Sequence, residues 1–154
     1  MKGHEKVIAT LNDLLADELT AISQYMVHSE MAADWGYQAL HEAIEKRAID
    51  EMKHAEEHIG RILFLEGTPN VSNLKKMHIG ADVEAGLHND HQSEDDAIKA
   101  YNAAIKLCTE LADNGTKELL DAILKDEEVH IDWLEAQLDQ IAQVGIQNYL
   151  AKQI

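Results

Sequence analysis

Residues 50–54 read DEMKH and residues 126–130 read DEEVH. Each stretch contains a Glu-x-x-His pair, which is Glu51 with His54 in the first and Glu127 with His130 in the second. At a spacing of three positions, glutamate and histidine project from one face of an α-helix. The sequence therefore predicts two helices that each direct one carboxylate and one imidazole into the same cavity.

A lone glutamate precedes each pair at the same distance. The interval from Glu18 to Glu51 equals the interval from Glu94 to Glu127, so the second set follows the first at one constant offset. Two further pairs share this offset, Tyr25 with Tyr101 and Asp50 with Asp126. The sequence therefore indicates that the chain contains two copies of one helical unit.

Two helices with a lone glutamate and two with Glu-x-x-His provide the ligand set of a di-iron or di-manganese site in a four-helix bundle. Four carboxylates balance the charge of two divalent ions, about +4, and neutral imidazoles complete the terminal positions. Cys108 is the only cysteine, which disfavours a structural zinc site. The candidate ligands are Glu18, Glu51, His54, Glu94, Glu127 and His130.

The position of these glutamates on their helices supports the same interpretation. Apolar residues alternate at steps of four and three along each helical segment, as on the inward face of a bundle helix. In the first segment the stripe runs Leu11, Leu15, Glu18, Ile22, Tyr25. A single Glu-x-x-His can arise by chance on an acidic helix, but four carboxylates inside apolar stripes require compensating charge. Metal ions would supply it.

The chain is predicted to form one all-α domain over residues 1–154. Helices are expected near residues 5–34, 39–66, 82–112, 116–144 and 146–153. Trp35-Gly36 predicts a tight turn, and Asn114-Gly115-Thr116 predicts a helix end followed by a threonine cap. Residues 67–81 contain the only proline, Pro69, and are too long for a tight turn, so they predict a crossover along the bundle.

Charge and hydropathy limit the partners. The formal net charge is −16, which argues against a nucleic-acid surface and favours attraction of cations. No segment approaches the roughly 20 apolar residues of a membrane span, and charges interrupt the first twelve residues, unlike a signal peptide. A cytoplasmic protein is expected.

Several stretches resemble bacterioferritin, a haem-containing ferritin family. They are Met1-Lys2-Gly3, residues 50–56, residues 61–67, residues 130–135 and Gly145-x-x-Asn148-Tyr149-Leu150. The resemblance covers the chain and is weakest between Pro69 and Gln92. It implies a ferritin-like four-helix bundle with a long crossover between the second and third helices and a short fifth helix.

The resemblance also implies an activity. A bacterioferritin is a ferroxidase that oxidises Fe²⁺ with O₂ or H₂O₂ and stores ferric mineral in a 24-subunit homo-oligomeric cage. By position, Glu51 and Glu127 would bridge the two irons. Glu18 with His54 would complete one iron, and Glu94 with His130 the other.

Met52 is the position at which the resemblance implies a second cofactor. One Met52 from each of two subunits would hold a haem b on the dimer axis, and a small ferredoxin would donate electrons for iron release. Met52 also belongs to a second apolar stripe, turned about 100° from Glu51. That stripe comprises Ile49, Met52, Ile59 and Leu63. Periodicity alone leaves a plain dimer contact open as the alternative.

Other features stay outside the ligand set. Lys46 stands where some relatives have a histidine that acts with the acid at position 50, which puts an auxiliary cavity-wall site in doubt. His58 and His91 are expected to be hydrogen-bonded neighbours, and Tyr25 and Tyr101 to anchor hydrogen bonds. Ile146, Leu150 and Ile154 form an apolar strip at steps of four. The resemblance implies that this strip closes the cage, with Asn148 and Tyr149 as its polar edges.

The rival function is that of a di-iron peroxidase of the rubrerythrin type with the same bundle and no cage. Rubrerythrins usually carry a Cys-x-x-Cys module, which this chain lacks.

Overall fold

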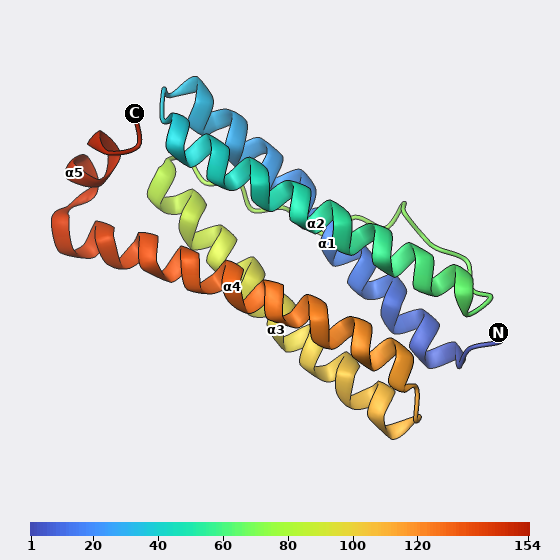
Figure 1. Cartoon of the computed structure of the whole chain (residues 1–154). Coiled ribbons are helices and arrows are strands. Elements are labelled where there is room, and N and C mark those ends of the chain that lie inside the picture. The colour runs from blue at the N-terminus through green and yellow to red at the C-terminus, as the bar shows by residue number, and fades with distance from the viewer.

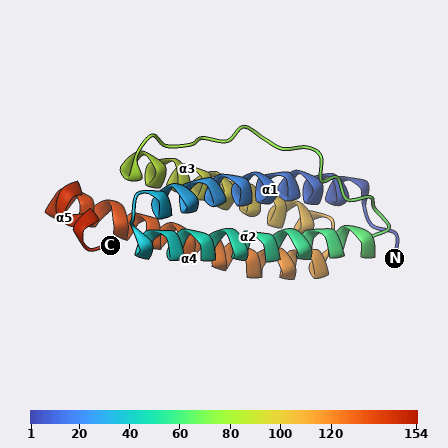
Figure 2. The same cartoon turned by 90° about the horizontal axis from the view of Figure 1, so that it is seen from above.

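Five helices account for most of the chain in the computed structural model, which describes residues 1–154 (Figure 1). Their bounds are α1 Glu5–Asp34, α2 Gln38–Phe64, α3 Val83–Glu110, α4 Asn114–Val144 and α5 Ile146–Ala151. The four long helices form a bundle, and α5 lies at the end opposite the N-terminus (Figure 2). The segment between α2 and α3 runs the length of the bundle on the side of α1 and α3 (Figure 2). The predicted all-α bundle with a crossover and a short fifth helix is confirmed.

The turns follow from local chemistry. Gly36 adopts φ 83° in the α1–α2 turn, where a side chain would be strained. Asp82 caps α3 by accepting the Ala85 N–H at 2.9 Å. The predicted threonine cap of α4 is wrong, because α4 begins at Asn114 and Asp113 accepts the Thr116 N–H at 3.0 Å. The side chain of aspartate, like that of threonine, can cap a helix by accepting a hydrogen bond from the third N–H of the helix.

The apolar core is divided into two clusters along the bundle axis. One cluster includes Leu15, Ala55 and Tyr101, and the other includes Tyr25 and Leu134. In each long helix, the sequence passes from one cluster to the other at the candidate glutamate. The candidate ligands therefore form a polar layer between two apolar halves.

The C-terminal segment packs against its own chain. Tyr149 is buried, and its hydroxyl donates a hydrogen bond to Gln137 Oε1 at 2.9 Å. The expected role of Tyr149 as a polar edge is therefore wrong, because its ring anchors α5 to α4. The Ala39 N–H donates to the Gln153 carbonyl at 3.0 Å, and Ile154 is 84% exposed. None of the helices has the combination of length and apolar character that a membrane span requires.

Candidate metal centre

The structure brings all six predicted ligands together in the middle of the bundle. Glu18 comes from α1, Glu51 and His54 from α2, Glu94 from α3, and Glu127 and His130 from α4. All six are at most 4% exposed. Their ligand atoms form two groups, each within 4.8 Å, and Glu51 and Glu127 belong to both. This is the arrangement expected for two adjacent cations that share two carboxylates.

Several nitrogen and oxygen atoms of the candidate ligands lie close together at this centre without forming hydrogen bonds. His130 Nδ1 lies 2.9 Å from Glu51 Oε1 and 2.9 Å from Glu127 Oε2. None of these three buried atoms has a hydrogen-bond partner. Buried polar atoms without partners are costly, by about 1–3 kcal/mol each. Cations among these atoms would satisfy them, so the donor set suits a pair of divalent metal ions.

Each histidine presents Nδ1 to the centre and Nε2 to an aspartate of the other motif. His54 Nε2 lies 3.2 Å from Asp126 Oδ2, and His130 Nε2 lies 3.8 Å from Asp50 Oδ2. A proton on Nε2, attracted to the carboxylate, leaves the Nδ1 lone pair free for a metal. The sequence offset paired Asp50 with Asp126 but assigned neither this role, because the partner of each lies on another helix.

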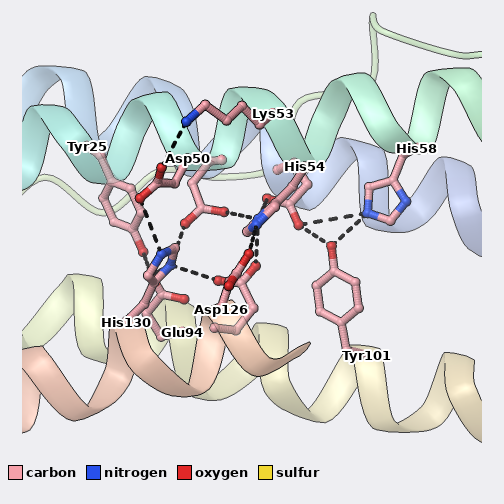
Figure 3. A network of polar contacts seen from close by, with 12 residues as sticks. Tyr25, Asp50, Lys53, His54, His58, Glu94, Tyr101, Asp126 and His130 are labelled. Atoms are coloured by element: carbon pink, nitrogen blue, oxygen red, sulfur yellow. Dashed lines mark hydrogen bonds and ion pairs between the residues drawn. The ribbon is translucent and has the colours of Figure 1, made fainter. Parts of the chain in front are cut away.

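Two buried tyrosines complete the layer (Figure 3). Tyr25 donates its hydroxyl proton to Glu94 Oε1 at 2.6 Å, and Tyr101 donates to Glu18 Oε1. Burial, together with the neighbouring carboxylates, raises the pKa of both phenols well above its usual value, so both remain donors. Behind Tyr101, His58 Nε2 lies 2.7 Å from the hydroxyl oxygen. Both tyrosines therefore anchor hydrogen bonds to candidate ligands.

The glutamates carry an excess of buried negative charge. Burial raises the pKa of Glu51, Glu94 and Glu127, and the charge of Glu18 raises the pKa of Glu51 further. Burial acts on Glu18 in the same sense, but hydrogen bonds with His54 and Glu51 hold its pKa below the usual value. Cations bound here would relieve this repulsion.

His91 lies outside the centre. Its side chain is 31% exposed, and its Nε2 is 3.4 Å from Glu135 Oε1. The expectation that His91 is a hydrogen-bonded neighbour of the ligands is therefore wrong, because its only partner is the exposed Glu135.

A polar pocket of about 400 Å³ leads to the centre from the side of α1, α3 and the crossover. Its lining includes the four candidate glutamates, together with Asp17 and Lys75. Lys75 Nζ lies 2.5 Å from Asp17 Oδ1, and the Lys75 N–H donates to Thr20 Oγ1 at 2.9 Å. The crossover therefore forms one wall of the approach to the ligands.

A second, mostly apolar pocket of about 710 Å³ lies on the outer face of α1 and α2. It is lined by Met26, Val27, Ile49 and Met52, among others, and Met52 is 47% exposed. Ile49, Met52 and Leu63 of the second apolar stripe are therefore exposed on the outside of α2, whereas Ile59 packs against the core of the subunit.

Known proteins are similar to this sequence over nearly its whole length. The family model of the ferritin-like domain matches residues 8–144. The chain is 43% identical over 149 residues to a bacterioferritin of Brucella melitensis, covering 97% of this chain and 92% of the relative. A bacterioferritin of Rhodobacter capsulatus is 42% identical with the same coverage. A bacterial ferritin of Neisseria meningitidis is 41% identical over 155 residues, covering 100% of both chains.

Proposed function

This chain belongs to the bacterioferritin family of ferritin-like proteins, and we propose that it stores iron and oxidises Fe²⁺ to Fe³⁺ at the buried carboxylate centre. The observation that carries the proposal is the pair of overlapping ligand groups that share Glu51 and Glu127. Their unpartnered buried atoms support a centre organised for cations.

In this proposal, Glu51 and Glu127 bridge two irons. Glu18 with His54 completes one position, and Glu94 with His130 completes the other. The mixed oxygen and nitrogen donors suit iron. Two Fe²⁺ ions held side by side would give up one electron each, and these two electrons, with two protons from the solvent, would reduce O₂ to H₂O₂, or H₂O₂ to two water molecules.

The protein prepares the centre for this substrate. Asp126 and Asp50 attract the Nε2 protons of His54 and His130, so each Nδ1 can act as a ligand. Glutamates that hold protons release them as Fe²⁺ binds, and the resulting carboxylates stabilise the ferric product. The polar pocket beside the crossover provides the approach for iron and oxidant.

We also propose that haem-bridged dimers assemble into a 24-subunit cage. The exposed apolar pocket around Met26, Ile49 and Met52 suits a flat apolar group between two subunits. Met52 would provide an axial thioether ligand to haem b. Haem bound there would conduct electrons from a small ferredoxin to the stored iron. The unpaired Cys108 is compatible with the cytoplasm, a reducing compartment.

Two measurements on the full chain test this function. Stopped-flow mixing with two Fe²⁺ per subunit is expected to show a fast oxidation phase. Size-exclusion chromatography with light scattering and a visible spectrum is expected to show a particle of several hundred kilodaltons with low-spin haem. A small colourless dimer with peroxidase activity would instead favour the rubrerythrin-type alternative.

A further inference from the structure

The two repeated halves of this chain differ at a position beside the metal centre. Every candidate ligand and both tyrosines have a counterpart at the constant offset between the two halves, but at that offset the counterpart of His58 is Leu134. His58 is fully buried, whereas Leu134 is buried within an apolar cluster. One half of the centre therefore has an imidazole that the other half lacks.

His58 extends the hydrogen bonds of one half only. Its ring is stacked on that of Tyr101, with centroids 5.8 Å apart, and Nε2 lies 2.7 Å from the Tyr101 hydroxyl oxygen. Tyr101 in turn donates to Glu18. Figure 3 shows His58 and Tyr101 at one end of the network and Tyr25 at the other. Tyr25 donates to Glu94 at 2.6 Å and has no other hydrogen-bond partner.

Because Tyr101 has a single hydroxyl proton, the donor and the acceptor in each of these hydrogen bonds can be assigned. The only hydroxyl proton of Tyr101 is donated to Glu18, so its oxygen must accept from His58 Nε2–H. In a neutral imidazole the other nitrogen then carries a lone pair, and His58 Nδ1 has no partner. His58 thus donates to Tyr101 and Tyr101 donates to Glu18, an order in which each bond strengthens the next.

We propose that His58 is a positioning residue for one metal of the pair. It fixes the Tyr101 hydroxyl, which holds Glu18 in place before a metal arrives. The Glu18–His54 position therefore binds a divalent cation more tightly than the Glu94–His130 position, where Tyr25 lacks such support. Ligands ordered in advance lose less conformational freedom on binding. This inference rests on the proposed function.

Two single-substitution variants allow Co²⁺ binding to be measured at each of the two metal positions separately. Glu94→Ala retains the Glu18–His54 position, and Glu18→Ala retains the Glu94–His130 position. Anaerobic Co²⁺ titration, followed by visible absorption, measures the affinity of each. Adding His58→Leu, which copies Leu134, is expected to weaken Co²⁺ binding about threefold to tenfold in Glu94→Ala, the effect of one ordinary hydrogen bond. In Glu18→Ala the change is expected to be less than twofold.

Two further variants separate positioning from packing. In the Glu94→Ala background, Tyr101→Phe should weaken Co²⁺ binding as much as His58→Leu does. Combining Tyr101→Phe with His58→Leu in that background should cause little further loss of affinity. His58→Gln retains an N–H donor and should preserve most of the affinity, which also covers the case in which the leucine variant misfolds.

Equal losses in both backgrounds, or no loss in Glu94→Ala, would overturn the inference. The chain without substitutions should bind two Co²⁺ per subunit. If it bound none, both the metal centre and this inference would be refuted, whereas normal binding unaffected by His58→Leu would refute the inference alone.

Discussion

His54 on α2 and Asp126 on α4 are joined across the bundle, with 3.2 Å between Nε2 and Oδ2. In the reciprocal pair, His130 Nε2 and Asp50 Oδ2 are farther apart, at 3.8 Å. Asp126 therefore orients His54 through a hydrogen bond, whereas Asp50 is beyond hydrogen-bond distance of His130 and acts on it through its charge.

Asp126→Asn should weaken divalent metal binding at the His54 position by about tenfold. The amide retains the size of aspartate but removes the charge that keeps the His54 proton on Nε2. Calorimetric titration with Co²⁺ measures the effect. Asp132→Asn, an exposed acid on the same helix, is the matched control and should bind normally. Equal affinities of the two variants would show that Asp126 does not orient His54.

Glu18→Ala, Glu94→Ala and His130→Ala should each assemble but lose the fast phase of Fe²⁺ oxidation. Each glutamate substitution also removes one buried carboxylate from a repulsive group, so the stability of the metal-free protein need not fall. Stopped-flow absorption at two Fe²⁺ per subunit measures the fast phase. Glu128→Ala, next to Glu127 but exposed, should retain it. An unchanged fast phase in all three variants is incompatible with the proposed centre.

Met52→Leu should give a cage that oxidises and stores iron but contains no haem and releases iron slowly to an external reductant. Leucine is close to methionine in volume and cannot ligate iron. The visible spectrum and the rate of reductive iron release test this. Met26→Leu, in the same pocket, is the control and should retain haem. A full complement of low-spin haem in Met52→Leu would exclude Met52 as the axial ligand.

Ending the chain at Gly145 should leave α1 to α4 and the metal centre folded but weaken assembly beyond the dimer. Every candidate ligand precedes the cut, and a six-residue α5 is too short to be stable in water unless it packs on a surface. Light scattering measures the particle, and circular dichroism controls for folding. Tyr149→Phe tests the Tyr149 hydroxyl alone, since it keeps the buried ring and removes only the hydrogen bond to Gln137. A stable 24-subunit particle from the truncated chain would show that α5 is dispensable.

The helices and the six candidate ligands could be predicted from the amino-acid sequence. Helical periodicity is local, so the step from Glu51 to His54 places both on one face before any other helix is considered. The constant offset between the repeated motifs then related the two halves. Local rules were less accurate at helix ends, where Asp113 caps α4 in place of the expected Thr116.

The contacts between side chains of different helices could not be predicted from the sequence and depend on the folded arrangement. The pairing of Asp126 with His54, the contact of His58 with Tyr101 and the burial of Tyr149 depend on how neighbouring helices are rotated and offset. Periodicity assigns a residue to a face, but it does not determine which residue of another helix lies opposite. That choice arises from the packing of complete side-chain surfaces.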